Sequence, residues 1–187
     1  MRHILPKYRL LIVFFLISLG VLSRTVWHLG DNVEAVTASA LVSGAYLGLG
    51  YSLLVPFLIM AISDLIIGNT NIFLFTWSAY LIIGGVGYYC QREKSQKKTK
   101  AVLRTFGLGL GAGVWFFLWT NFGVWLLDSW GMYPKTLTGL VNAYLMGLPF
   151  LKMNLLGHLF LVPLYFGTME LVKYVLEKVF IKTTADC

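Results

Sequence analysis

The sequence predicts an all-α integral membrane protein with six transmembrane helices and a re-entrant or interfacial segment on its outer face. Of its 187 residues, 58% are hydrophobic and only 12% are charged, against roughly 25% charged in an ordinary soluble domain. The hydrophobic residues form long runs separated by short polar segments. The net charge of +7 comes from lysines and arginines near the ends of these runs, where cations indicate membrane topology. The length allows a single membrane domain, residues 1–187.

The first apolar run, about residues 8–23, predicts the first span. A helix needs about 20 residues, and at least about 17, to cross a hydrocarbon core of roughly 30 Å. Arg2, Lys7 and Arg9 precede or begin this run, which also resembles a secretory signal peptide. The following sequence, Ser23-Arg24-Thr25-Val26-Trp27, has no small-x-small cleavage pattern. We therefore expect an uncleaved span.

The next apolar region, residues 35–67, is too long for one span and short for two. The segment from Gly48 to Ser52 lies near its middle and offers glycines for a tight turn. We expect a helical hairpin with spans at about 35–49 and 51–67. Pro56 falls inside the second arm, where neighbouring helices make a proline tolerable.

Three further spans are expected at about 72–89, 101–120 and 151–172. The segment between the last two, residues 121–150, carries Trp125, Trp130 and Tyr133, residue types that favour membrane–water boundaries. Residues 137–148 are apolar but too few to cross. We expect a short interfacial or re-entrant helix there, stopped by Pro149.

The lysines and arginines predict the orientation. With six spans and a cytoplasmic N-terminus, only Arg24, Lys135 and Lys152 fall outside. The other 12 of the 15 fall inside: Arg2, Lys7, Arg9, Arg92, Lys94, Lys97, Lys98, Lys100, Arg104, Lys173, Lys178 and Lys182. Cytoplasmic loops are enriched in these residues. Both termini are therefore expected in the cytoplasm.

The outer loops contain the candidate ligand-binding residues. These loops collect varied hydrogen-bonding and stacking side chains, whereas the inner loops contain mainly cations. A small-molecule site combines apolar walls with a few placed polar groups. The predicted substrate-binding residues are Trp27, Asn32, Glu34, Asp64, Asn69, Asn121, Trp125, Tyr133, Lys135, Asn142 and Tyr144. The alternative is that the aromatic residues form an interfacial belt and that the polar residues cap helices.

Asp64 is the most informative single residue. It lies near the outer end of the third predicted span, and a carboxylate costs about 2.5–3.5 kcal/mol at the centre of a span and less toward its end. It also lies near a helix C-terminus, where the dipole disfavours negative charge. We expect Arg24 or Lys135 to compensate it. Such an ion pair is equally compatible with a structural and with a ligand-contacting role.

Small residues recur at spacing four, a pattern that permits close contact between apolar helices. Ala40, Gly44 and Gly48 form one series, and Gly107 with Gly111 forms another, overlapping with Gly109 and Gly113. They are predicted to serve helix or subunit packing, within the bundle or against another chain. The run GLGLGAG is not a phosphate loop, because it lies within a span and lacks the Lys-Ser/Thr ending.

Catalysis, metal binding and a cofactor are not expected. The histidines His3, His28 and His158 are scattered, and no metalloprotease, paired-cysteine or nucleophile-elbow motif occurs. Cys90 and Cys187 do not form a disulfide framework or zinc pattern.

The segments NVEAVTASALVSGAYLG, SDLIIGN, TNFGVW and YPKTLTGLVNAYLMGLPF resemble those of a family of small bacterial six-span membrane proteins grouped with the S components of energy-coupling-factor (ECF) transporters. The resemblance covers most of the chain after the first span. It implies an S-component-like bundle in the bacterial inner membrane that binds a vitamin or similar micronutrient. The implied partners are a membrane coupling protein and two ATPases. One departure is that the first span, LLIVFFLISLGVLS, lacks the alanine-x-x-x-alanine contact typical of S components.

Three functional classes follow. The first is a micronutrient-binding transport subunit, which hydrolyses nothing itself and binds no nucleic acid. The second is a non-catalytic structural or assembly subunit of a larger membrane complex. The third is a membrane enzyme acting on lipid, which requires Asp64 and His158 to come within hydrogen-bonding reach.

Overall fold

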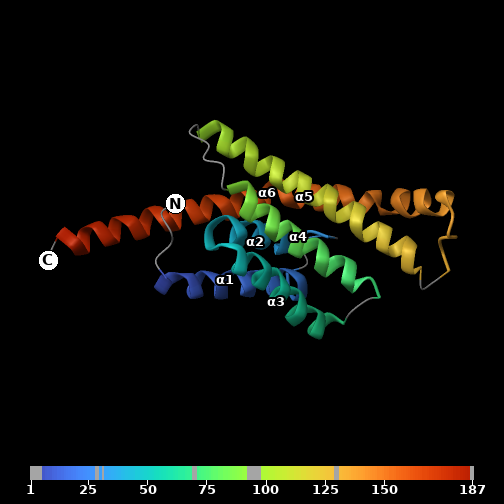
Figure 1. Cartoon of the computed structure of the whole chain (residues 1–187), viewed down its shortest axis with the longest axis horizontal. Coiled ribbons are helices and arrows are strands. Elements are labelled where there is room, and N and C mark those ends of the chain that lie inside the picture. The colour runs from blue at the N-terminus through green and yellow to red at the C-terminus, as the bar shows by residue number, and fades with distance from the viewer. Residues whose placement is uncertain are drawn as a thin grey trace.

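Six helices make up the protein in the computed structural model, which describes residues 6–27, 30, 32–68, 71–91, 98–128 and 131–185 (Figure 1). The described residues contain no strand. The second helix has an α-helical part, α2, that continues into a π-helical turn, η1. The elements are α1 (Pro6–Thr25), α2 (Val36–Val42), η1 (Ser43–Leu47), α3 (Leu49–Ile67), α4 (Phe73–Gln91), α5 (Lys98–Leu127) and α6 (Leu137–Ala185).

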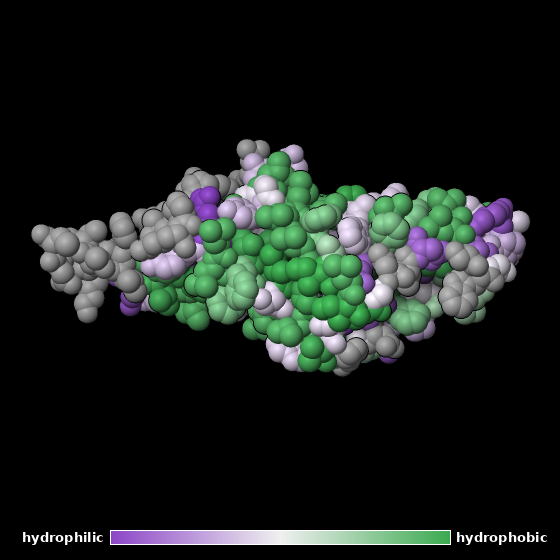
Figure 2. All heavy atoms as spheres, turned by 90° about the horizontal axis from the view of Figure 1, so that it is seen from below, coloured by the Kyte–Doolittle hydropathy of each residue, from purple (hydrophilic) through white to green (hydrophobic). Residues whose placement is uncertain are grey.

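Five of the helices, α1, α3, α4, α5 and α6, are long and apolar enough to cross a membrane. Large apolar side chains on them point away from the bundle: Leu65 is 87% exposed and Phe160 is 76% exposed. Figure 2 shows hydrophobic residues covering the middle of one face, with hydrophilic residues toward its two ends. A contiguous apolar surface of this kind is stable only in contact with lipid or protein. The architecture therefore indicates a multi-pass helical membrane protein.

The predicted second span, residues 35–49, is not a full span. Seven residues of α2 and five of η1 extend about 18 Å at 1.5 Å per residue, well short of the hydrocarbon core. Every residue of α2 is buried, and α2 contacts α1, α3, α4, α5 and α6. The apolar sequence of this segment therefore reflects contact with the other helices and not exposure to lipid.

The predicted turn at Gly48 is present. Gly48 separates η1 from α3 with φ of 105°, a backbone conformation that glycine adopts without steric cost. The hairpin was predicted correctly, whereas the depth reached by its first arm was not.

The predicted interfacial helix is part of a longer helix. α6 runs without interruption from Leu137 through Pro149 and Pro163 to Ala185, so Pro149 does not end it and the span does not begin at residue 151. Likewise α5 extends from Lys98 to Leu127, beyond the predicted range of 101–120. A proline removes one backbone hydrogen bond, but ending a helix within an apolar environment would leave several backbone groups without partners.

Glycines let α4 pack closely against the short second helix (α2 and η1) and against α3. A Cβ atom at Gly44 would lie 2.3 Å from the Gly84 carbonyl oxygen, and one at Gly87 would lie 2.4 Å from the Leu41 carbonyl oxygen. At Gly84 it would lie 2.0 Å from the carbonyl oxygen of Ser52 on α3. Glycine at these positions lets the backbones approach. Gly44 and Gly87 bring the short second helix against α4, and Gly84 brings α3 against α4.

Contacts along the helices show which ends lie together. Arg24 near the end of α1 meets Asp64 near the end of α3, and Phe75 near the start of α4 contacts Gly123 near the end of α5. We call this the turn end of the bundle, because it contains the α3–α4 and α5–α6 turns. At the opposite end, the hydroxyl of Tyr46 on η1 donates to Glu170 Oε1 on α6 at 2.7 Å. Beyond Glu170, α6 extends past the other helices toward the C-terminus (Figure 1).

Candidate functional site

Arg24 organises a charged network inside the turn end. Its Nε lies 2.9 Å from Glu34 Oε2, and its Nη1 lies 2.8 Å from Asp64 Oδ1. Nη1 also donates to Ser63 Oγ at 2.6 Å. The side chains of Arg24, Glu34 and Asp64 are 14%, 18% and 8% exposed. The structure thus confirms the predicted pairing of Asp64 with Arg24 and brings Glu34 to the same guanidinium.

Two aromatic side chains of α4 complete the network. The Tyr80 hydroxyl donates to Glu34 Oε1, and Trp77 Nε1 donates to Asp64 Oδ2 at 2.7 Å. All four carboxylate oxygens therefore accept a hydrogen bond. With one guanidinium and two ionised carboxylates, the network carries a formal charge of −1. We use the name charged network for Arg24, Glu34, Asp64, Trp77 and Tyr80.

Residues 32–35 lead into α2 beside α1 and place Glu34 in the charged network. The Ala35 N–H donates to Ser23 Oγ at 3.0 Å, so α2 begins beside α1 and not beyond its end. Gly30 and Asn32 have positive φ values of 145° and 57°, conformations that favour glycine and asparagine. Asn154 Nδ2 on α6 donates to the Asn32 carbonyl oxygen at 3.2 Å. The non-helical residues 32–35 are therefore held by two hydrogen bonds, one from α6 to Asn32 and one from Ala35 to α1.

Of the predicted binding residues, only Asn32, Glu34 and Asp64 lie at or next to the charged network. Asn69 lies outside the described residues, as do His28 and Asp31. Trp27 follows the end of α1 and is 47% exposed. The six remaining residues, Asn121, Trp125, Tyr133, Lys135, Asn142 and Tyr144, belong to α5, α6 or the turn between them.

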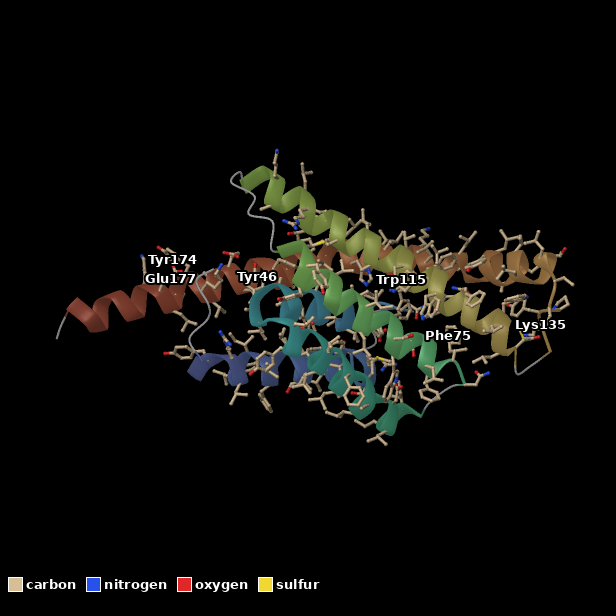
Figure 3. All side chains as sticks on the ribbon, viewed as in Figure 1. Tyr46, Phe75, Trp115, Lys135, Tyr174 and Glu177 are labelled. Atoms are coloured by element: carbon tan, nitrogen blue, oxygen red, sulfur yellow. The ribbon has the colours of Figure 1, made fainter. Side chains whose placement is uncertain are left out.

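Three of the predicted binding residues in the α5–α6 hairpin form hydrogen bonds within that hairpin. Trp125 Nε1 donates to the Pro134 carbonyl oxygen at 3.0 Å, and the Tyr144 hydroxyl donates to the Leu118 carbonyl oxygen at 3.0 Å. Lys135 Nζ donates to the carbonyl oxygens of Trp125 and Leu126, at the end of α5 (Figure 3). Lys135 was the alternative predicted partner of Asp64. It instead binds helix-terminal carbonyls, which attract a cation in the absence of further N–H donors.

The other hairpin residues show the same separation from the charged network. Asn121 Nδ2 donates to the Phe117 carbonyl oxygen of its own helix at 2.8 Å. The backbone N–H of Tyr133 donates to Asp128 Oδ2 at 3.0 Å, and Asn142 is exposed on α6. Asn121 and the backbone of Tyr133 therefore form local hydrogen bonds within or next to α5.

The small residues differ in their surroundings. Ala40 is fully buried, and Gly44 lies against α4. Gly109 and Gly113 face α6, where added Cβ atoms would meet Val162 and Asn154. Beside Gly107 and Gly111 the described residues leave open space. The predicted pair Gly107 and Gly111 therefore does not pack within the described bundle, whereas the overlapping pair does.

The sequence interpretation missed Trp77, Tyr80 and Asn154. Trp77 and Tyr80 are three residues apart on α4, so they share a helix face, and Gly84 and Gly87 continue that face. This series of an indole, a phenol and two glycines was the available signal. Asn154 offered no comparable signal, because its contact with Asn32 is made across more than one hundred residues.

Asp64 and His158 do not form the pair required by the lipid-enzyme hypothesis. Both Asp64 oxygens bind Arg24 or Trp77. His158 Nδ1 lies 3.1 Å from the Gly109 carbonyl oxygen, and within the described part of the chain its Nε2 has no hydrogen-bond partner. This particular acid–base arrangement is therefore absent.

Comparison with known proteins gives one family. Neither a curated protein nor a solved structure matches the chain. The profile of a family described as "Family of unknown function (DUF6580)" matches residues 5–179, which include all five potential spans, the short second helix and the charged network. The chain belongs to the DUF6580 family.

Proposed function

We propose that this protein is the substrate-binding membrane subunit of an importer for a vitamin or similar micronutrient. The turn end faces the outside, both termini lie in the cytoplasm, and separate coupling and ATPase subunits supply the energy. The ligand binds at the turn end, over the charged network and the segment from Asn32 to Ala35. The observation that carries this proposal is a net negative network beside non-helical backbone inside a bundle of potential membrane spans.

Three physical features support a binding role. Ionisable side chains within spanning segments are costly, and they mark substrate or ion sites by default. Non-helical backbone at membrane depth is tolerated where it is buried in protein or lines a cavity. Transporters commonly bind their substrates where a short or broken helix meets such backbone. Here the short helix α2, the segment before it and Arg24 meet at one place.

A purely structural role of the charged network makes a different prediction. Because every carboxylate oxygen already accepts a hydrogen bond, the network also suits an ion-pair lock between α1, α3, α4 and the segment before α2. A lock predicts that weakening the network lowers stability alone. A ligand site predicts that a mild change lowers ligand retention while the protein still folds.

The test is purification in mild detergent followed by native mass spectrometry. We expect the wild-type protein to retain a small molecule. Tyr80→Phe and Glu34→Gln are expected to retain at least about tenfold less, because each weakens the charged network that the ligand covers, and about 1.4 kcal/mol of binding free energy is tenfold in affinity. Tyr46→Phe is the matched control, since it removes a tyrosine–glutamate hydrogen bond at the opposite end. Tyr80→Phe with full ligand content and reduced folded yield would favour the lock.

The orientation predicts the behaviour of reporter fusions. Alkaline phosphatase fused after Lys98 is expected to be inactive, because the basic segment before α5 stays in the cytoplasm. The same reporter inserted at Gly131, in the α5–α6 turn, is expected to be active. Fluorescent protein fused to the C-terminus should fluoresce. An active phosphatase after Lys98 would place the charged network on the cytoplasmic side and remove the proposed route of uptake.

A structural or assembly subunit is the second candidate. It is favoured by the open space beside Gly107 and Gly111 among the described residues, because small residues on an apolar helix face allow another helix to approach closely. The same mass spectra separate the two functions. Stoichiometric protein partners without a bound small molecule would support this candidate against the first.

A further inference from the structure

Two buried side chains of α6 have polar atoms without partners. Asn154 is 4% exposed and His158 is 2% exposed. Among the described residues, neither Asn154 Oδ1 nor His158 Nε2 has a hydrogen-bond partner. Buried polar groups in proteins are nearly always hydrogen-bonded, and exceptions often mark functional sites or the place of a bound molecule.

The hydrogen bond made by the other polar atom of each side chain shows that Asn154 Oδ1 and His158 Nε2 are acceptors. His158 Nδ1 lies 3.1 Å from the Gly109 carbonyl oxygen, and a carbonyl oxygen can only accept, so Nδ1 carries the proton. In a neutral imidazole Nε2 then has a free lone pair. Asn154 donates through Nδ2 to the Asn32 carbonyl oxygen, which leaves Oδ1 as the acceptor. Both unsatisfied atoms therefore require a donor.

The two side chains share one location between α5, α6 and the segment before α2. They are one helical turn apart, so they lie on the same face of α6. A Cβ atom at Gly113 would lie 2.8 Å from Asn154 Oδ1 and 2.9 Å from His158 Nδ1, so the absence of a side chain there makes room for both. Val33 covers the adjacent Gly157, whose added Cβ would lie 2.9 Å from Val33 Cγ1.

Among the described residues, no donor binds Asn154 Oδ1 or His158 Nε2. Trp115 Nε1 on α5 is a buried donor, but within the described structure it also lacks a partner, so it does not bind either acceptor. Lys152 and Met153 precede Asn154 on α6, and both point outward. A donor from a bound molecule would satisfy both atoms.

We propose that Asn154 and His158 bind the N–H or O–H groups of a small molecule that is rich in hydrogen-bond donors. This inference rests on the proposed function and names the chemical class of its ligand. The segment from Asn32 to Glu34 connects these acceptors to the charged network. Two free acceptors and a network of charge −1 select a neutral or cationic ligand that is rich in donors, and disfavour an anionic one.

The test measures retained small molecule and thermal stability in the same preparations. His158→Leu and Asn154→Leu are expected to retain at least about tenfold less small molecule than the wild type. Without ligand, His158→Leu is expected to keep or raise the Tm, because an apolar group replaces an unsatisfied buried acceptor. The control is Thr120→Val, which removes a buried hydroxyl that already donates to the Phe116 carbonyl oxygen. The released molecule is expected to contain exchangeable N–H or O–H donors by mass and hydrogen–deuterium exchange.

A second measurement keeps His158 intact. His3→Gln and His28→Gln together leave His158 as the only histidine. With ¹⁵N-labelled imidazole, the Nε2 signal is expected to report an unprotonated nitrogen that changes its chemical shift when the small molecule is removed. An unchanged shift would overturn the inference.

The outcomes separate this inference from the proposed function. Full retention by both leucine variants would mean that Asn154 and His158 bind only buried water, and binding at the charged network would survive. A released molecule with neither N–H nor O–H groups would have the same meaning. A wild-type protein that retains no small molecule would overturn the proposed function and this inference with it.

Discussion

Replacement of Arg24 by Leu is expected to cause the largest loss of folded protein among single charge changes. Arg24 faces two carboxylates, Glu34 and Asp64, at 2.9 and 2.8 Å in the interior of the turn end. Removing one partner from a buried ion pair costs about 3–5 kcal/mol, because a charge remains buried without compensation. We expect the monodisperse fraction in size-exclusion chromatography to fall sharply and the Tm of the remainder to drop.

Two controls separate charge from general damage. The triple variant Arg24→Leu/Glu34→Gln/Asp64→Asn is expected to recover much of the yield, since neutral groups do not leave an isolated charge buried. Lys173→Met removes the cation from the exposed pair with Glu170, whose side chain is 58% exposed, and should cost about 1 kcal/mol or less. Equal losses for Arg24→Leu and the triple variant would show that side-chain packing, and not charge, determines the effect.

Gly84→Ala and Gly85→Ala should differ strongly although the residues are neighbours. A Cβ atom at Gly84 would lie 2.0 Å from the Ser52 carbonyl oxygen, which is backbone and cannot rotate away. Overpacking costs about 1–3 kcal/mol and sometimes more, and we expect the upper end here because α3 and α4 must separate. At Gly85 the described residues leave open space, so alanine should be neutral or stabilise by about 0.5–1 kcal/mol through helix propensity.

Comparison of the two alanine variants by thermal unfolding in one detergent provides the measurement. A larger residue at Gly84, such as valine, should be worse than alanine. If Gly84→Ala and Gly85→Ala unfold at the same temperature, the close approach of α3 and α4 at Ser52 is not a feature of the folded protein.

The sequence alone was sufficient where a local pattern has one physical solution. A carboxylate at position 64 of an apolar run required a cation, and Arg24, one of the two predicted partners, supplies it. A glycine between two apolar arms predicted the turn at Gly48. Hydrophobic runs of about 20 residues predicted the long helices, since few structures other than helices can bury their backbone groups in lipid.

The errors arose where tertiary contacts decide the outcome. The apolar sequence of residues 36–47 is compatible with lipid and with the centre of a bundle, and only the surrounding helices distinguish the two. Pro149 ends a helix in water but not in α6. Lys135 was expected near Asp64 because both lie at the turn end, but the end of α5 offers it nearer acceptors. The sequence showed which residues are apolar or charged, but not where each one lies within the bundle.

The continuity of α6 has a mechanical consequence. The same unbroken helix carries Asn154 and His158 in its middle and Glu170, which binds Tyr46 on η1, three turns farther along. The distance from His158 to Glu170 is about 18 Å at 1.5 Å per residue, and the helix continues through Pro163 over that length. A tilt of α6 that follows occupancy of its middle would therefore displace its projecting C-terminal part. In the proposed importer, the cytoplasmic subunits would then sense an occupied site through the angle of α6.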